Sequence, residues 1–225
     1  MATPAAKKIA EADFPTRWGH FRILGFQGAL PAPQPGCDPA ATNSGPGEEL
    51  VALVMGDIHA AAPAPAPVVR IHSQCLTGDV FGSLRCDCRL QLELALKRIA
   101  AEGVGILLYE QQEGRGIGLM AKLKAYELQD HGLDTVEANV ELGFAADCRA
   151  YELPAQVLKA LGVSRVRLIT NNPEKVAALE ASGIRVVERV SAEVVPQDSF
   201  AGYLKTKHEK MGHIVETVIG EDDSE

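Results

Sequence analysis

Three cysteines placed close together have the most evident chemistry in this sequence. Cys75, Cys86 and Cys88 follow the spacing Cys-x10-Cys-x-Cys. Thiolates this close in a chain without secretory features hold a soft metal more often than they form disulfides. Three sulfur ligands suit tetrahedral zinc and leave its fourth position to water, as in a catalytic site. We therefore expect one zinc ion per chain, bound by these three side chains.

Two plainer interpretations fit the same cysteine spacing. Free cysteines are among the most buried residues, so the three thiols can simply belong to the core. Alternatively, His72 supplies a fourth ligand and closes a structural zinc site. The charged and polar residues that crowd the stretch 70–88 favour the catalytic interpretation over both.

Two loops have the composition of phosphate-binding sites. In the first, residues 113–116 (EGRG), glycines allow close backbone approach and Arg115 offers a planar fork of donors. In the second, residues 170–175 (TNNPEK), a helix N-terminus, a hydroxyl and an ammonium can converge on an anion. Taken alone, each has an ordinary alternative: a glycine turn in the first loop, and a capped helix with a solvated lysine in the second.

Asp147 and Arg149 form a third candidate pair. They are two residues apart, so on an extended segment their side chains share one face. The alternative is a surface ion pair that contributes little to stability. Cys148 then points elsewhere and packs, and Cys37, in a proline- and glycine-rich stretch, has no expected role.

The elements around these residues predict an α/β fold. Strands are expected near residues 22–26, 51–57 and 68–72, and from Cys88 helices alternate with strands at 106–109, 166–170 and 184–188. Such β-α-β units predict a single domain with a mixed, largely parallel sheet flanked by helices, and ligand sites at the C-terminal ends of the strands. We assign residues 1–13 to an N-terminal arm, 14–213 to the domain, 29–49 to an exposed insertion and 214–225 to an acidic tail.

Composition narrows the possible partners. The 225 residues are 46% hydrophobic and 23% charged, which is ordinary for a globular protein. A formal net charge of −8 argues against a duplex nucleic acid partner. The N-terminus lacks the apolar core of a signal peptide, and no run approaches the length of a membrane span. We expect a cytoplasmic protein with neither a nucleic acid nor a membrane partner.

Six motifs occur in a fixed order along the chain. They are 72–79 (HSQCLTGD), 84–88 (LRCDC), 112–118 (QEGRGIG), 134–139 (DTVEAN), 143–147 (GFAAD) and 170–173 (TNNP). Together, within residues 14–213, they closely resemble GTP cyclohydrolase II of riboflavin biosynthesis. The resemblance implies a homodimeric hydrolase that opens the imidazole ring of GTP, releases formate and pyrophosphate, leaves a diaminopyrimidine ribosylamino phosphate, and requires Mg²⁺ with the triphosphate as well as zinc.

The resemblance also assigns roles to residues. It makes Cys75, Cys86 and Cys88 zinc ligands; Arg70, Ile71, His72, Ser73, Gln74, Gln91, Glu113, Gly114, Arg115, Thr135, Thr170 and Lys175 GTP-binding residues; and Tyr126, Asp147 and Arg149 catalytic residues. In the family pattern Asp147 accepts a proton and Arg149 is a nucleophile at the α-phosphate. A guanidinium is almost always protonated, so a charge clamp on the departing pyrophosphate is an equal alternative for Arg149.

Two other classes of protein, a zinc deaminase and a non-catalytic nucleotide-binding module, share some of these features. A zinc nucleobase deaminase also attacks a base ring, but it carries a His-x-Glu and Pro-Cys-x-x-Cys pattern that this sequence lacks. A non-catalytic nucleotide-binding module with structural zinc leaves Tyr126, Asp147 and Arg149 without a shared purpose. Release of formate rather than ammonia distinguishes the cyclohydrolase from the deaminase.

Overall fold

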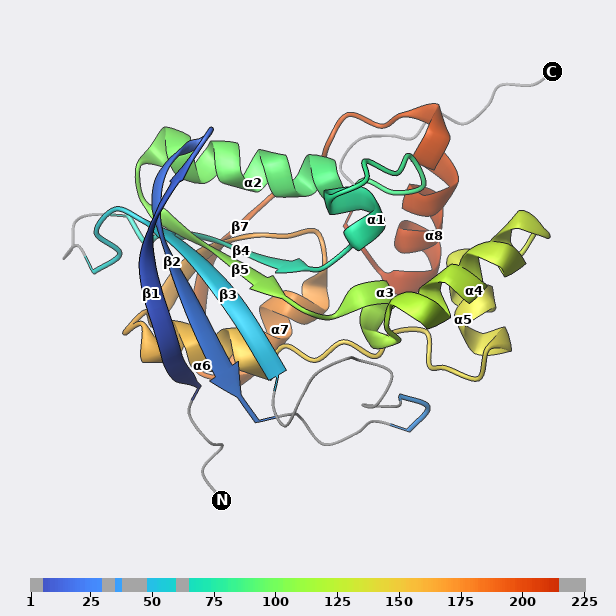
Figure 1. The fold of residues 1–225 in the computed structure, drawn as a ribbon, viewed down its shortest axis with the longest axis horizontal. Helices are drawn as coiled ribbons and strands as arrows, with labels where there is room; N and C mark the ends of the chain where they lie inside the picture. The colour runs from blue at the N-terminus through green and yellow to red at the C-terminus, as the bar shows by residue number, and fades with distance from the viewer. Residues whose placement is uncertain (1–5, 30–34, 38–47, 60–64, 215–225) are drawn as a thin grey trace.

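A seven-stranded mixed sheet forms the centre of the computed structural model, which describes residues 6–29, 35–37, 48–59 and 65–214 (Figure 1). The spatial order of its strands is β1-β2-β3-β5-β4-β6-β7. The strands are β1 (Lys7–Thr16), β2 (Gly19–Gly28), β3 (Glu48–Met55), β4 (Val68–Ser73), β5 (Gly105–Glu110), β6 (Arg165–Ile169) and β7 (Arg185–Val190).

One half of the sheet is antiparallel. β1 pairs with β2, β2 with β3, and β3 with β5, all antiparallel. In β3 buried and partly exposed residues alternate, as expected for a strand with one covered face, whereas β1 is an almost fully exposed edge strand. Lysines at the start of β1 protect that edge from pairing with other chains.

The other half of the sheet is parallel and is covered on both faces. β5, β4, β6 and β7 run parallel, and β4 and β5 are buried along nearly their whole length. Helix α2 (Cys88–Glu102) packs on one face against β4 and β5, and α7 (Pro173–Ala181) packs on the other against β7; α6 (Glu152–Ala160) lies beside α7 and contacts β1, β2 and β3 of the antiparallel half (Figure 1). Burial on both faces explains the continuous apolar runs of these strands. The predicted α/β fold with a mixed sheet is confirmed.

The remaining helices gather beyond the C-terminal ends of β4 and β5 (Figure 1). They are α1 (Leu76–Asp79), α3 (Glu113–Gly116), α4 (Leu119–Asp130), α5 (Thr135–Glu141) and α8 (Ala201–Met211), with a short 3-10 turn, η2 (Asp198–Phe200), before α8. None of the helices among the described residues is long and apolar enough to cross a membrane.

The structure corrects two details of the sequence prediction. The N-terminal arm expected over 1–13 is wrong from Lys7 onward, because those residues form β1. The insertion expected over 29–49 ends earlier, because β3 begins at the buried Glu48. Residues 30–34, 38–47 and 215–225 lie outside the described part of the chain, so most of the expected insertion and tail does too.

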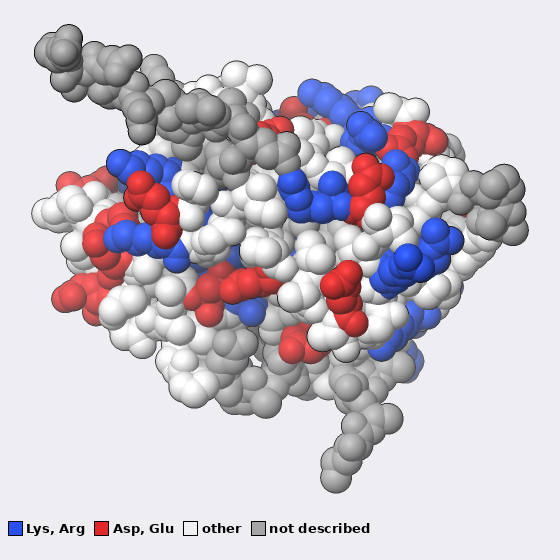
Figure 2. Space-filling model, turned by 180° about the vertical axis from the view of Figure 1, so that it is seen from behind, with Lys and Arg blue, Asp and Glu red and all other residues white. Residues whose placement is uncertain are grey.

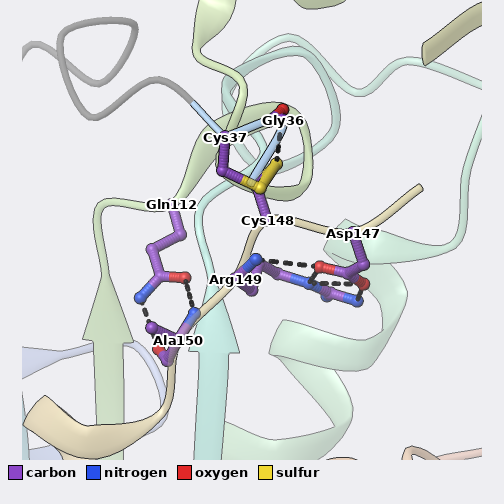
Figure 3. The surroundings of a disulfide bond; sticks show 7 residues. All are labelled: Gly36, Cys37, Gln112, Asp147, Cys148, Arg149 and Ala150. Carbon is purple, nitrogen blue, oxygen red and sulfur yellow. Dashed lines mark hydrogen bonds and ion pairs between the residues drawn. A yellow bond between two sulfur atoms is a disulfide. The ribbon is translucent and has the colours of Figure 1, made fainter. Parts of the chain in front are cut away.

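A disulfide between Cys37 and Cys148 is a further correction. The two cysteines are 111 residues apart in sequence, and the bond joins residues 35–37 to the segment that carries Asp147 and Arg149 (Figure 3). Cys37 is therefore not a bystander, and Cys148 is covalently bonded rather than merely packed. A backbone hydrogen bond from Ala145 N to Gly36 O, at 3.0 Å, adds to the same junction.

Charged side chains of both signs are interspersed on the face of the molecule opposite to that in Figure 1. There, lysines and arginines lie among aspartates and glutamates instead of merging into one basic surface (Figure 2). A duplex nucleic acid requires a continuous basic face, so this side of the molecule does not suit one.

Candidate active site

The three cysteines of the predicted metal site come together at the end of β4. Cys75 precedes α1, Cys86 lies in the following loop and Cys88 opens α2. Their Sγ atoms all lie within 4.8 Å of one another, with Cys75 and Cys86 3.7 Å apart. Gly78 permits this approach, since a Cβ there would lie 3.1 Å from the Cys86 sulfur. The donor set and its compactness fit a zinc ion.

His72 lies near the cluster but is not part of it. Its Nε2 is 3.1 Å from both carboxylate oxygens of Asp79, and its ring stacks on Tyr109. Burial lowers the pKa of His72, although Asp79 opposes that shift. The geometry therefore favours an open three-sulfur site over one closed by His72.

Lys122, which the sequence analysis did not single out, lies against the cluster. Its Nζ donates to Cys75 Sγ at 3.1 Å and to Glu113 Oε1 at 2.6 Å. Hydrogen bonds from Cys86 and Cys88, together with the Lys122 ammonium, lower the pKa of Cys75 despite its burial. Burial disfavours the Lys122 cation, but Cys75 and Glu113 outweigh that effect and raise its pKa. Lys122 thus supplies a positive charge beside thiolates that would otherwise give a zinc complex a net negative charge.

A cavity opens directly over the cysteines. The predicted residues that line it are Ser73, Gln74, Cys75, Cys86, Cys88, Glu113, Gly114, Arg115, Tyr126, Thr135 and Arg149. Tyr126 Oη is 3.1 Å from Thr77 Oγ1, and burial raises the pKa of the phenol. Tyr126 therefore remains protonated and can donate a hydrogen bond into this sulfur cavity, the name we use below.

A second cavity adjoins the first and is rich in buried cations. The predicted residues that line it are Arg70, His72, Ser73, Cys88, Gln91, Arg115, Arg149, Thr170 and Lys175. Thr170 and Lys175 come from the end of β6 and the first turn of α7, where Asn172 caps the helix by accepting from Glu174 N at 2.9 Å. We call this the cation cavity. Its charge and its helix N-terminus suit a polyphosphate.

Lys175 is the most deeply buried of these cations. Its Nζ donates to Ile71 O at 2.9 Å, and Ser73 Oγ lies 3.4 Å away. Burial lowers the pKa of Lys175 to about 7, with Glu110 opposing the shift and the neighbouring arginines adding to it. The charge of this lysine therefore changes near neutral pH in the free protein.

Arg115 occupies a strained backbone position at the junction of the two cavities. Its φ is +62°, the sole positive value for a non-glycine residue among the described residues. Both of its terminal nitrogens are buried without a hydrogen-bond partner in the described structure. Strain of this kind persists where the surroundings impose it, commonly at ligand sites. An unpaired buried guanidinium fork indicates that an anion belongs there.

Asp147 and Arg149 form a mostly buried ion pair. Arg149 Nε donates to both carboxylate oxygens of Asp147, at 2.9 and 3.1 Å, and its Nη2 contacts Oδ2 (Figure 3). Burial would raise the pKa of Asp147, but Arg149 outweighs it and the pKa is lowered. The expected alternative of a surface ion pair does not hold, because the two side chains are only 17% and 13% exposed.

The segment that carries this pair is fixed by Gln112 and Arg115. The Gln112 side chain donates to Ala150 O at 2.6 Å and accepts from Ala150 N at 2.9 Å, while Cys148 N donates to Arg115 O at 2.9 Å. Gly116 is required here, because a Cβ at that residue would lie 2.7 Å from Cys148 O. Arg149 is thus anchored where the two cavities meet.

Two of the residues predicted for the site line neither cavity. Ile71 is fully buried and contributes its backbone carbonyl to Lys175, while Asp147 contacts Arg149 from behind. All the other predicted residues line at least one cavity, and Ser73, Cys88, Arg115 and Arg149 line both. The structure therefore combines the metal motif and both phosphate loops in one site with two adjoining cavities.

Comparison with known proteins identifies the family. The GTP cyclohydrolase II family model matches residues 7–191. GTP cyclohydrolase-2 of Enterobacter sp. (strain 638) is 53% identical over 209 residues, 93% of this chain and 97% of that protein. The enzyme from Buchnera aphidicola is 51% identical over 92% of this chain and 97% of its own, and that from Escherichia coli is 53% identical over 93% and 97%. This chain belongs to the GTP cyclohydrolase II family.

As a GTP cyclohydrolase II, the chain is an enzyme, and the resemblance found in its motifs is confirmed. Several residues around the site were nevertheless missed in the sequence: Gln112, Lys122, Asn139, Tyr203 and Lys207. Lys122 and Lys207 look like solvated helix lysines in the sequence, and no local pattern shows that they face a cavity. Tyr203 and Lys207 are four residues apart, which places them on one face of a helix and was the available signal.

Proposed function

We propose that this enzyme hydrolyses GTP in riboflavin biosynthesis, opening the imidazole ring and releasing formate and pyrophosphate to form 2,5-diamino-6-(5-phosphoribosylamino)pyrimidin-4(3H)-one. The observation that carries the proposal is the joining of the sulfur cavity to the cation cavity through shared residues. In this arrangement the guanine base lies over the cysteines and the triphosphate lies among the cations. A metal site and a phosphate site that can both contact the same bound nucleotide match a reaction that breaks bonds in the base and in the triphosphate.

Cys75, Cys86 and Cys88 would hold zinc, and their separation fits that ion. When bound, zinc supplies Lewis acidity for attack by water at C8 of the base. Lys122 balances the charge of the thiolates and keeps Glu113 in place through its 2.6 Å hydrogen bond. Tyr126, protonated and facing the same cavity, donates a hydrogen bond or a proton to the opening ring.

Arg149 lies at the junction of the cavities, and Asp147 acts through its ion pair with Arg149. The lowered pKa of Asp147 keeps it ionised, so it can accept a proton once substrate displaces part of its pairing with Arg149. Burial alone would lower the pKa of Arg149, but Tyr151 and Asp147 raise it well above its usual value. A guanidinium held in its protonated form stabilises negative charge on a leaving pyrophosphate, so we favour the clamp over the nucleophile.

The remaining GTP-binding roles follow the positions in the two cavities. Arg70, Gln91, Arg115, Thr170 and Lys175 contact the phosphates, Ser73 lies at the junction beside the ribose, and Gln74, Gly114, Glu113 and Thr135 contact the base. His72 holds the Asp79 carboxylate through its Nε2, and the Ile71 carbonyl accepts a hydrogen bond from the Lys175 ammonium. We further propose that Mg²⁺ accompanies the triphosphate, that two copies form a homodimer, that the enzyme is cytoplasmic, and that one domain comprises β1 through α8.

Incubation of the purified zinc-loaded protein with GTP tests the proposal directly. Mass spectrometry should show the diaminopyrimidine product, with one formate and one pyrophosphate for each GTP consumed. Ammonia without formate would favour a deaminase. Binding of GTP with no product would favour a nucleotide-binding module. A Tyr126→Phe variant, which removes only the phenol oxygen, should bind GTP but open the ring more slowly.

A further inference from the structure

Helix α8 lies beyond the residues matched by the family model, yet it reaches both cavities. Tyr203 lines the sulfur cavity and the cation cavity, and Lys207 lines the cation cavity. The two are one helical turn apart, and the Lys207 ammonium lies 4.4 Å from the centre of the Tyr203 ring. Among the elements described above, α8 is therefore the one with a place at the site but no assigned role.

Lys207 does not face the cation cavity as a free phosphate ligand. Its Nζ donates to Asp87 Oδ1 at 2.7 Å, with the Lys207 side chain 11% exposed and that of Asp87 2% exposed. Arg115 presents the opposite situation, because its terminal nitrogens have no hydrogen-bond partner in the part of the chain that the structure describes. Since its charge is already paired, Lys207 is suited to holding Asp87 rather than to binding phosphate itself.

Asp87 uses its carboxylate in an unusual way. It is the N-cap residue of α2, where an aspartate ordinarily accepts from the helix's own backbone N–H groups, but no such side-chain bond is present. Instead, Oδ1 accepts from Lys207 and Oδ2 accepts from Gln91 Nε2 at 2.6 Å. The residue between two of the zinc ligands thus connects α8 to the interior of α2.

The connection continues into the cation cavity. Gln91 Oε1 accepts from Arg70 Nη2 at 2.6 Å, and Arg70 Nη1 donates to Ile169 O at 3.0 Å at the end of β6. The resulting chain runs Lys207–Asp87–Gln91–Arg70. It joins the loop of the sulfur cluster to an arginine of the phosphate site through four buried or half-buried side chains.

Helix α8 is itself fixed at three places. Phe200 is buried at its start, Lys210 pairs with Glu137 of α5 at 2.9 Å, and Ile214 N donates to Asn171 O at 2.9 Å. The second contact involves the helix that carries Thr135, and the third involves the loop of Thr170. The helix therefore spans the residues expected to bind both ends of the nucleotide.

We propose that Lys207 is a positioning residue of the nucleotide site, which acts through Asp87 and Gln91 to align the cysteine loop with Arg70. The inference rests on the function proposed above. Without the ammonium, the buried Asp87 carboxylate loses its cation partner and is drawn toward Arg70, which would pull the arginine out of line with the phosphates. Small displacements of positioning groups reduce catalysis strongly.

The decisive experiment compares three variants of the full-length, zinc-loaded protein. Lys207→Met keeps the aliphatic stem but removes the charge, Lys207→Arg keeps the charge, and Lys205→Met is the matched control on the exposed side of the same helix, where Lys205 is 68% exposed. For Lys207→Met we expect kcat/KM for GTP to fall by about 30-fold, because a misplaced positioning group costs up to about 10²-fold. Lys207→Arg should recover most of that loss, and Lys205→Met should stay within about twofold of wild type.

Equilibrium binding of a GTP analogue with a non-hydrolysable α,β bridge supplies the second readout. Its Kd should rise about tenfold in Lys207→Met and return toward wild type in Lys207→Arg, by the same positioning argument. This measurement does not need turnover. If the wild type bound the analogue but released no formate, the proposed function would fail while the role of Lys207 would still be tested.

A double substitution protects the experiment against misfolding. Asp87→Asn combined with Lys207→Gln replaces the ion pair by two neutral groups of similar size. The loss of kcat/KM in this double variant, expressed as a free energy, should be smaller than the sum of the losses in Asp87→Asn and Lys207→Gln measured singly. Equal losses from Lys207→Met and Lys205→Met, or no recovery in Lys207→Arg, would overturn the proposal. So would strictly additive losses in the double variant.

Discussion

The sulfur cavity and the cation cavity share walls but differ in how their charges are balanced. Beside the cysteines of the sulfur cavity the charges are paired, because Lys122 contacts both Cys75 and Glu113. In the cation cavity positive charge is in excess, since the terminal nitrogens of Arg115 have no partner among the described residues and Lys175 is bonded chiefly to the neutral Ile71 carbonyl. The thiolates of the first cavity therefore suit a metal cation, whereas the uncompensated positive charge of the second suits an anionic ligand.

This difference predicts that substitutions in the two cavities affect different halves of the reaction. Changes at the cysteines should block formate release, and changes at the cations should weaken binding or slow pyrophosphate release.

Replacing Cys86 should have the largest effect. Cys86→Ser removes one of three sulfur ligands, so zinc should be lost and formate release should fall by at least about 10³-fold, since Lewis acid catalysis contributes several kcal/mol. Metal analysis and a formate assay measure both. As a control, Cys37→Ser with Cys148→Ser should keep one zinc per chain, because neither sulfur belongs to the cluster. A Cys86→Ser protein with full zinc content would contradict the assigned ligands.

Replacing Arg149 should act mainly on the other half of the reaction. Arg149→Ala should slow pyrophosphate release by about 10²-fold, as for other groups that stabilise developing negative charge, and should leave zinc in place. Lysine at this position keeps a charge without the planar fork, so Arg149→Lys should be intermediate.

The nucleophile alternative for Arg149 makes a different prediction. It requires a nucleotidyl adduct on Arg149 in the wild type, detectable by acid quench and peptide mass spectrometry. A clamp forms no adduct. Unchanged pyrophosphate release in Arg149→Ala would remove both roles.

Lys175 should make nucleotide binding depend on pH. Burial lowers its pKa from the ordinary 10.5 to about 7, so the free enzyme carries this charge below pH 7 and loses it above. Phosphate binding favours the charged form, so above pH 7 binding requires proton uptake. The Kd of the GTP analogue should then rise by up to about tenfold per pH unit, as linkage requires.

Lys175→Met provides the comparison for that pH profile. The variant should bind weakly at all pH values and should lack the step near pH 7. A step of the same size in the variant would assign the titration to another group, such as the neighbouring Glu110, whose own pKa is raised by burial.

His72 should have the smallest effect on metal. Because its Nε2 contacts Asp79 rather than the sulfur cluster, His72→Ala should keep one zinc per chain, measured by metal analysis. Loss of zinc from that variant, in a protein that still melts cooperatively, would indicate a closed structural site.

The sequence was sufficient for the elements with strong local patterns. The apolar runs of β4 and β5 and the Asn172-Pro173 start of α7 were predicted from local rules, and each delivers site residues where expected. The cysteine motif also carries its own spacing, so its convergence did not depend on distant parts of the chain.

The features that were missed depend on contacts between distant residues. Pairing of Cys37 with Cys148 spans 111 residues and has no local signature. The almost fully exposed β1 shows no alternation of buried and exposed residues, because it is an edge strand. Lys122 and Lys207 are ordinary helix lysines until tertiary structure places Cys75 and Asp87 beside them.

The backbone of Arg115 has a consequence for attempts to engineer this enzyme. A non-glycine residue in the left-handed region costs about 1 kcal/mol, which glycine would recover. A library screened only for heat resistance would therefore enrich Arg115→Gly. That substitution removes the guanidinium that we expect to bind an anionic group of the nucleotide. Thermostable descendants of this chain should be selected on GTP turnover at the same time, because at this position the most stable residue and the useful one are different.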